Sequence, residues 1–477
     1  MKGIFDAVGN GDIFVWHSPG GTVQMIKIYR NYVPARSLLF IVVDVTLLFV
    51  VLNIATHYTF QGGGGGWSGS LFSVTALSIL LVATTALSGV AAGVYRQDIG
   101  HMGPWLGTAG TAVGLALTFG SVVVLASRFF HAAPPISLAH WEIGLPAVWP
   151  ISFFLTRWVE RAAARRGYFT RRILLIGAGA NATEIEAFAR RIGSTIEVAE
   201  RIDPDTVKCD LSIERLKSRR IREVVIAVDD QKNVPMELLL QWKLSGIAVT
   251  DCLTFWEREA GHIALGAFDP AWFVYGEGCH RNWLGRGVKR AIDVVVAVLL
   301  LIVTSPLLLL FAALIRLESE GPVFYRQVRT GRYGKPFTIL KFRSMRADAE
   351  AATPQWAAAA DPRVTRVGKF MRSTRIDELP QLLTVIRGDM SLIGPRPERP
   401  FFVDQLDKAI PHYNDRHYVR PGLTGWAQIN YPYGASIADA RRKLAYDLYY
   451  VKNQSTLLDL YIMIATVRVI LLREGSR

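Results

Sequence analysis

The sequence predicts a membrane α/β protein with three parts: a four-helix transmembrane bundle, a Rossmann-like α/β domain, and an α+β domain anchored by a re-entrant helix. Several apolar runs in the first third of the chain each approach the ~20 residues that are needed to cross a bilayer. A strand, a glycine turn and a helix follow them. Another apolar run then precedes a segment in which strand-like and helical patterns alternate.

The composition favours a membrane protein with anionic partners. Of the 477 residues, 51% are hydrophobic, and the mean hydropathy of +0.24 is high for a soluble protein. The net charge is +14 and the pI is about 9.7, which suits a membrane surface or a nucleotide. Nucleic acid would also suit this charge. However, the basic residues stand beside apolar runs and no nucleic-acid motif occurs, so we expect inner-membrane lipids and not nucleic acid.

The transmembrane bundle is predicted at residues 37–160, after a short lead-in at residues 1–36. Lysine and arginine precede the first run and follow the last, whereas the loop after the first run has neither. Because positive charge stays on the cytoplasmic side, both ends of the bundle are expected there. The predicted spans are 37–58, 71–95, 104–127 and 137–158.

The Rossmann-like cytosolic domain is predicted at residues 170–280, where short buried strands alternate with helical patterns. Further strands are expected within 222–230 and 246–252.

Its first turn contains a glycine fingerprint. Gly177, Gly179 and Ala182 have the G-x-G-x-x-A spacing of dinucleotide-binding loops, and Glu197 or Glu200 lies near the offset of a ribose-binding acid. The fingerprint therefore marks a possible nucleotide loop. No hydride-transfer residues follow in this short domain, and a fold does not imply a function. A structural, oligomerising or ligand-sensing role is favoured over a redox role.

The next apolar run, at residues 291–316, poses a conflict of topology. It is long enough to span, yet lysine and arginine flank both of its ends. Ser305 and Pro306 lie in its middle; the proline removes a helical hydrogen bond, and the serine can satisfy a freed carbonyl. We expect a helix–break–helix that dips into the inner leaflet and returns. The alternative is an ordinary proline-kinked span.

Adjacent carboxylates, Asp377 and Glu378, stand among many arginines in the segment 371–400. Guanidinium groups hold phosphate oxygens through paired hydrogen bonds, and a carboxylate can bind magnesium or attack phosphorus. Pro380 predicts a helix that begins near Asp377 and ends at Gly388. Asp377 would then be either a simple N-cap or a functional carboxylate at an anion-binding helix terminus.

A series of short motifs continues on both sides of these carboxylates. The motifs are Lys341-Phe342-Arg343-Ser344-Met345, Asp361-Pro362-Arg363, Arg372 with Asp377-Glu378-Leu379-Pro380-Gln381, Gly388-Asp389-Met390-Ser391, Gly394-Pro395-Arg396-Pro397 and Arg420-Pro421-Gly422-Leu423-Thr424-Gly425-Trp426. With these motifs, the chain from about Lys289 to the end resembles the bacterial sugar transferases, the monotopic polyprenyl-phosphate hexose-1-phosphate transferases. The preceding part resembles that of the large, multi-spanning members that initiate exopolysaccharide or O-antigen synthesis.

The resemblance implies transfer of a hexose-1-phosphate from a UDP-sugar to undecaprenyl phosphate, with release of UMP. Asp377 matches the nucleophile that forms a phosphosugar–aspartyl intermediate, and Glu378 would orient it or relay a proton. Mg²⁺ or Mn²⁺ at Asp377 would neutralise the diphosphate. Glucose or galactose is the expected sugar.

The same resemblance suggests further substrate-binding residues. Arg372, Pro395 and Arg396 match positions near the substrate phosphates. Lys341 and Arg343 alternate along a strand and could hold phosphate, although a solvated basic edge is equally compatible with their spacing. Two other matched positions are Trp426, expected to pack in the core, and Asp447, whose role the sequence does not explain.

These features predict a catalytic domain at residues 286–477 on the cytoplasmic face of a bacterial inner membrane, in a protein that forms a homodimer. The main alternative is a membrane-anchored nucleotide-sugar oxidoreductase or dehydratase that uses the Rossmann-like domain. A non-enzymatic scaffold for polysaccharide assembly is the second alternative.

Overall fold

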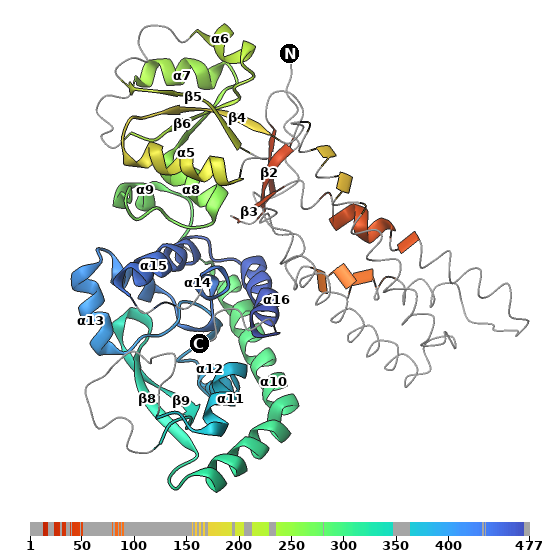
Figure 1. Ribbon diagram of the computed structural model, residues 1–477, viewed down its shortest axis with the longest axis vertical. Coiled ribbons are helices and arrows are strands. Elements are labelled where there is room, and N and C mark those ends of the chain that lie inside the picture. Colours follow the sequence, from red (N-terminus) through yellow and green to blue (C-terminus); the bar gives the residue numbers. More distant parts are fainter. Residues whose placement is uncertain are drawn as a thin grey trace, which may run out of the picture. The chain divides into compact units, whose positions relative to one another are not determined.

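The computed structural model describes residues 170–471, except 193–195, 205–211, 229–234, 280, 347–362, 432–433 and 435, together with short pieces between residues 13 and 166. The chain forms two compact units, shown in Figure 1. Unit 1 comprises Met1–Ile28 and Tyr32–Phe255, and unit 2 comprises Tyr29–Asn31 and Trp256–Arg477.

The N-terminal part contains a small sheet in the order β1-β2-β3, formed by Ile13–His17, Val23–Ile28 and Asn31–Pro34. Helical backbone is described within the first two predicted spans, at 41–47, 49–50, 82–83, 85–86 and 88–89. The third span at 104–127 and nearly all of the fourth at 137–158 lie outside the described residues. The predicted four-helix bundle therefore stays a prediction.

A four-stranded parallel sheet forms the centre of unit 1 (Figure 1). Its order is β5-β4-β6-β7, and each neighbouring pair is parallel. The strands expected within 222–230 and 246–252 are confirmed, with shorter bounds. The strands are β4 (Arg171–Ile176), β5 (Ile196–Ile202), β6 (Glu223–Ile226) and β7 (Ala248–Asp251), and the helices are α5 (Ala180–Ile192), α6 (Ile213–Ser218), α7 (Met236–Leu244) and α8 (Cys252–Ala260).

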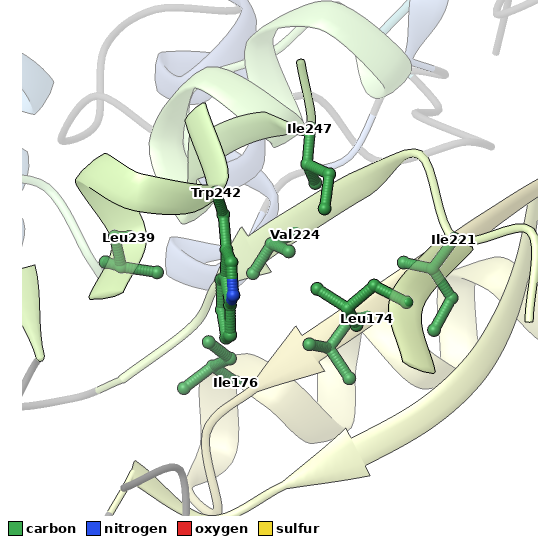
Figure 2. Close-up of a cluster of buried hydrophobic side chains, with 8 residues drawn as sticks. Leu174, Ile176, Ile221, Val224, Leu239, Trp242 and Ile247 are labelled. Carbon is green, nitrogen blue, oxygen red and sulfur yellow. The ribbon is translucent and has the colours of Figure 1, made fainter. Parts of the chain in front are cut away.

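A tryptophan packs α7 onto this sheet. Figure 2 shows the Trp242 ring reaching from the helix toward Ile176, in a cluster that also contains Leu174 and Val224. All four side chains are fully buried. Strands buried on both faces are continuous apolar runs, which is why the segment RILLI reads as a strand of a parallel sheet.

Unit 2 combines a β-hairpin, a short parallel strand pair and a set of helices. The hairpin consists of β8 (Phe324–Thr330) and β9 (Pro336–Phe342), joined by the turn η3 (Arg332–Gly334). The other elements are α9 (Pro270–Tyr275), α10 (Trp283–Glu318), α11 (Arg366–Thr374), η4 (Ile376–Gln381), α12 (Leu382–Arg387), β10 (Ser391–Ile393), α13 (Pro400–Ala409), η5 (Tyr413–Tyr418), β11 (Gly422–Thr424), α14 (Trp426–Asn430), α15 (Ile437–Lys452) and α16 (Thr456–Leu471).

Helix α10 is long and apolar enough to cross a membrane, and no other helix among the described residues is. The structure differs from the predicted break, because the backbone stays helical through Pro306. Figure 1 instead shows α10 bending part-way along its length. Pro306 cannot bond to the carbonyl of Ile302, and the Ser305 hydroxyl donates to that carbonyl at 2.8 Å. The helix therefore bends without leaving this polar group unsatisfied.

Both halves of α10 pack on the rest of unit 2, whereas much of its middle is exposed. In the first half, Arg290 donates to the carbonyls of Val385 and Ile386 at the end of α12, both at 2.6 Å. In the second half, Phe311 and Ile315 belong to a buried cluster that includes residues of β9, α11 and η4. Between these contacts, exposed side chains include Val295, Leu299, Ile302, Val303, Leu309 and Leu310.

Candidate functional site

The predicted carboxylate pair lies in the turn between α11 and α12. Arg375 has a left-handed backbone conformation with φ of 57°, which ends α11 and starts η4. Such a conformation is uncommon outside glycine. Asp377 is not the N-cap that the local pattern allowed, because Arg375 occupies that position and makes no side-chain cap. The predicted end of the helical segment at Gly388 is confirmed, with φ of 102°.

Glu378 is a buried carboxylate held by two cations. Its Oε1 lies 3.3 Å from Lys341 Nζ on β9, and Arg396 binds both of its oxygens at 2.5 and 3.3 Å. Burial by itself raises the pKa of Glu378, but Arg396 and Lys341 outweigh it and hold the pKa well below the ordinary value. Glu378 is therefore a fixed anion.

Asp377, the neighbouring residue, differs from Glu378 in both its contacts and the direction of its pKa shift. Its side chain is 9% exposed and has no hydrogen-bond partner among the described residues. Burial, and then the charge of Glu378, raise the pKa of Asp377 to about 6, against the opposing effect of Lys341, Arg372 and Arg396. We call Asp377 and Glu378 the dyad: one carboxylate is occupied by cations, and the other is available.

Arg372 approaches the dyad from the last turn of α11. Its Nε donates to the Ser344 hydroxyl at 3.0 Å, which fixes the guanidinium plane. Its two terminal nitrogens have no hydrogen bond within the described part of the chain. They could bind phosphate oxygens as a pair.

Arg343 has different partners from those expected. Its guanidinium donates to the carbonyls of Ser319 and Glu320, just after α10, and to the Ser319 hydroxyl. The side chain is buried. These contacts tie the end of α10 to the hairpin and argue against the predicted phosphate contact. Lys341 therefore contacts the dyad, whereas Arg343 contacts the backbone just after α10, although the two residues alternate along the same segment.

The loop that carries Pro395 and Arg396 is held by β11. The carbonyl of Pro395 accepts the amide of Gly422 at 2.9 Å, and the amide of Gly394 donates to Thr424 at 2.9 Å. A Cβ on Gly394 would lie 2.3 Å from a backbone oxygen, so only glycine allows this approach. Two motifs that are separate in the sequence therefore pack against each other, and together they position Arg396.

Arg416 supports Arg396 through a hydrogen bond to its backbone carbonyl, and no motif in the sequence pointed to Arg416. Its Nη2 donates to the Arg396 carbonyl at 3.0 Å and forms an ion pair with Asp447 at 2.7 Å. Both side chains of the pair are at most 5% exposed. Burial alone lowers the pKa of Arg416, but Asp447 outweighs it and raises the pKa. This contact gives Asp447 a role that its position in the sequence did not explain.

Trp426 packs in unit 2, as expected. Its indole N–H donates to the carbonyl of Gly261 at 2.7 Å, and its ring stacks on Tyr449 with centroids 5.4 Å apart. A structural role is therefore confirmed for this side chain.

The dyad offers carboxylate oxygen for the predicted metal. Within the described residues, no three His, Cys, Asp or Glu side chains cluster so that they could hold an ion alone. The available carboxylate of Asp377 nevertheless fits Mg²⁺, which is often bound by one or two carboxylates together with substrate phosphates.

The carbonyls of the glycine loop in unit 1 accept hydrogen bonds from a side chain of the same unit. Gly177 has φ of +150°, and a Cβ there would lie 2.3 Å from the Ala227 carbonyl oxygen. Arg201 donates to the carbonyls of Gly177 and Ala178 at 2.9 and 2.6 Å, and more weakly to that of Gly179 at 3.4 Å. The glycines therefore serve a tight turn, and nucleotide binding stays a hypothesis.

The acids expected near the ribose also have partners. Glu197 pairs with Arg172 at 3.0 Å, and Glu200 pairs with Arg215 and Arg219 at 3.1 and 2.6 Å. Neither carboxylate is without a cation.

Comparison with known proteins agrees with the motifs around the dyad. The family model of the bacterial sugar transferases matches residues 284–473. A UDP-glucose:undecaprenyl-phosphate glucose-1-phosphate transferase of Caulobacter vibrioides is 45% identical over 190 residues, which are 39% of this chain and 71% of that protein. The chain belongs to the bacterial sugar transferase family.

Other relatives differ in the sugar that they are named for. A UDP-N-acetylgalactosamine-undecaprenyl-phosphate N-acetylgalactosaminephosphotransferase of Aeromonas hydrophila is 51% identical over 42% of this chain and 49% of its own length. An undecaprenyl-phosphate glucose phosphotransferase of Komagataeibacter xylinus is 33% identical over 62% of this chain and 58% of its own length. The match thus spans about half the length of these two relatives.

Proposed function

We propose that the chain transfers a hexose-1-phosphate from a UDP-sugar to undecaprenyl phosphate and releases UMP, through a covalent intermediate at Asp377. The reaction would initiate exopolysaccharide or O-antigen synthesis. The observation that supports this most strongly is a difference between the two carboxylates of the dyad: Glu378 forms ion pairs with cations, and Asp377 does not. The printed names of the Caulobacter and Aeromonas relatives describe reactions of this class.

Two displacements at phosphorus make up the proposed reaction. A carboxylate oxygen of Asp377 attacks the phosphorus that bears the sugar, and the bond from that phosphorus to the UMP oxygen breaks. An oxygen of undecaprenyl phosphate then attacks the same phosphorus, and the bond to Asp377 breaks. The carboxylate is regenerated, and the product carries a diphosphate. A covalent step lets two polyanions visit one site in turn.

The neighbouring side chains stabilise charge in this scheme. Arg372 presents two guanidinium nitrogens that can hold phosphate oxygens. Lys341 and Arg396 compensate Glu378, which would otherwise repel the incoming diphosphate. Glu378, which is held as an anion, orients Asp377 or the metal, and its lowered pKa argues against a proton relay.

We include Mg²⁺ or Mn²⁺ in the proposal, with Asp377 as its protein ligand. When bound, such an ion neutralises charge on the diphosphate. The hard oxygen of a carboxylate and the phosphate oxygens of the donor favour these ions over zinc.

The site is proposed to lie at the cytoplasmic face of a bacterial inner membrane, with residues 286–477 as the catalytic domain. The exposed apolar middle of α10 fits a re-entrant helix in the inner leaflet, and basic residues at both of its ends favour the cytoplasm. Residues 37–160 would add four spans. Because UDP-sugars are cytosolic, this orientation brings the donor to the site.

The Rossmann-like domain at residues 170–280 is proposed to have a structural or oligomerising role in a homodimer. The hydrogen bonds from Arg201 to the glycine loop support a structural turn there. A bound nicotinamide cofactor would instead support the oxidoreductase alternative.

The proposal is tested by UMP release from a panel of donors. Purified protein with undecaprenyl phosphate is given UDP-glucose, UDP-galactose and their N-acetylated counterparts, because relatives are named for both kinds of sugar. We expect release from at least one donor and loss of more than 99% of it in Asp377→Asn, because an amide cannot form the acyl phosphate. A folded Asp377→Asn protein that keeps a tenth of the turnover would refute the nucleophilic role.

A further inference from the structure

A hollow of about 570 Å³ lies in unit 2 beside the turn between β8 and β9. This volume is within the range of small-molecule sites. We call it the η5 pocket, after the element that forms one wall. The residues that decide its chemistry are Tyr333, Asp404, Asn414, Asp415, His417 and Tyr418. Neither residue of the dyad lines it.

His417 is a buried, neutral histidine in this wall. It is 7% exposed, and burial followed by the charge of Arg416 lowers its pKa to about 3, so the imidazole is neutral. Its Nδ1 lies 3.2 Å from the side-chain oxygen of Asn414, and Nε2 is buried without a hydrogen-bond partner in the described part of the chain. His417 therefore adds no positive charge to the pocket.

Carboxylates supply the acceptors of the pocket, and Thr330 and Asn414 can both donate and accept. Asp404 and Asp415 contribute carboxylates, and no lysine or arginine lines the pocket. Asp415 also lies within hydrogen-bond distance of His412, with 3.1 Å between Oδ2 and Nδ1. A phosphate would meet repulsion here, whereas hydroxyl groups would meet acceptors. The lining thus favours a neutral ligand with several O–H donors.

Two tyrosine rings give the pocket an aromatic side. Tyr333 and Tyr418 are 59% and 61% exposed, and their rings meet edge to face at 6.2 Å. Arg332 fixes the pair by donating to the Tyr333 hydroxyl at 2.8 Å and to the Tyr418 carbonyl at 3.3 Å. Tyr333 has φ of 58°, an uncommon conformation for a bulky residue, and such outliers cluster at binding sites.

We propose that the η5 pocket binds a neutral hexopyranose, with the C–H face of the sugar ring against the tyrosines and its hydroxyls donating to the acceptors. The hexose could belong to the nucleotide donor or to a separate glycan, since the recognised chemistry is the same. Only the first source rests on the proposed function. In either case η5 connects the pocket to the dyad, because Arg416 of η5 holds the Arg396 carbonyl.

The test measures binding without turnover. Full-length Asp377→Asn protein in lipid nanodiscs is titrated with methyl glucoside and methyl galactoside, and binding is followed by saturation-transfer NMR. We expect at least one glycoside to bind, and Tyr418→Ala to weaken binding at least tenfold. Asp404→Asn, a milder change at an exposed position, should weaken it in the same direction. Tyr275→Ala is the matched control, because Tyr275 is 88% exposed in the same unit and does not line the pocket.

Two results would overturn the proposal. One is the absence of binding by both glycosides. The other is unchanged binding in both Tyr418→Ala and Asp404→Asn. Competition then identifies the source of the sugar: displacement by the UDP-hexose but not by UDP assigns the pocket to the donor, and no displacement by either assigns it to a separate glycan. If UDP itself, which carries no hexose, displaced the glycoside, the proposal would be overturned, because the pocket would then bind the nucleotide. Since the variant is inactive by design, failure here is distinct from failure of the transfer reaction.

Discussion

Asp377 and Glu378 are adjacent in sequence, but their surroundings move their pKa values in opposite directions. Lys341 and Arg396 hold Glu378 as an anion, whereas burial and the charge of Glu378 raise the pKa of Asp377. Pairs of carboxyl groups whose pKa values are driven apart are typical of active sites. The residue with the raised pKa is also the one without a hydrogen-bond partner in the described part of the chain.

The pKa of Asp377 predicts how the first half-reaction depends on pH. Attack requires the ionised carboxylate, and a pKa of about 6 means that the ionised fraction falls as the pH falls through 6. This pKa belongs to the metal-free site and Mg²⁺ at Asp377 would lower it, so we expect the rate of UMP release in a single turnover to fall by up to about tenfold between pH 7 and pH 5. Lipid acceptor is left out, so that its own titrating phosphate does not contribute.

A control separates this titration from ionisation elsewhere. Binding of the donor to Asp377→Asn should be nearly constant over the same pH range, because the donor diphosphate stays ionised. If UMP release were equally fast at pH 5 and pH 7, a raised pKa at Asp377 could not govern the reaction.

The ion pair between Arg416 and Asp447 predicts a large effect on stability. Asp447→Asn leaves a buried guanidinium without its counter-charge, which typically costs about 3–5 kcal/mol of unfolding free energy. Replacing both residues, as in Arg416→Met with Asp447→Leu, removes the unpaired charge and should recover part of the loss. Thermal unfolding of the protein in detergent measures both effects. An unchanged melting temperature in Asp447→Asn would show that the pair contributes little.

Motif spacing identified Asp377, Glu378 and Arg396, because these residues lie close together in the sequence. It did not identify the partners of Arg343 and Arg416. Arg343 reaches carbonyls at positions 319 and 320, and Arg416 reaches Asp447; such contacts depend on the tertiary fold. An arginine that binds backbone carbonyls and one that binds phosphate have the same sequence signal.

At the scale of elements, α10 and α16 show how apolar segments bury their polar residues. Asp459 interrupts the apolar pattern of α16, and such a pattern is typical of an interfacial amphipathic helix. The carboxylate is instead buried in unit 2 and accepts from Arg281, Lys289 and Tyr450 at 2.9, 3.1 and 2.7 Å. Exposed side chains of α16 include apolar Leu457 and Leu460. Sequence periodicity gives amphipathicity, but it does not say which face meets the protein.

The bent α10 predicts the topology of the catalytic unit. Single cysteines are placed at Arg286 and Lys335 in a cysteine-free background, because both positions are exposed and lie on either side of the apolar run of α10. If α10 enters and leaves the same leaflet, an impermeant thiol reagent labels both only from the cytoplasmic side. The flanking positive charges favour this result.

A spanning helix gives a different pattern of labelling. The Arg286→Cys probe would react from the cytoplasm and the Lys335→Cys probe from outside, which would refute re-entry. Replacing Pro306 by leucine serves as a second variant, since it restores a backbone donor within the helix and reduces the cause of the bend.

At the scale of the whole molecule, unit 2 extends further toward the N-terminus than the family match. Its main segment begins at Trp256, whereas the match begins at residue 284. Glu257 explains why: it accepts from the buried Lys452 and Asn453 at 2.9 and 2.7 Å. Without it, a buried ammonium would lose its counter-charge. Sequence composition could not place this boundary, because the contact joins segments that are nearly 200 residues apart.

In the proposed mechanism, Asp377 carries both half-reactions. The most direct measurement is mass spectrometry of the protein after incubation, in the absence of lipid acceptor, with a UDP-sugar that it accepts as a donor. We expect one hexose-phosphate adduct on the peptide that contains Asp377, formed together with UMP. The adduct should disappear when undecaprenyl phosphate is added, and it should not form in Asp377→Asn. The contradicting result has two parts. The wild-type protein would form product, yet it would release no UMP before the acceptor is added and would show no adduct at any stage.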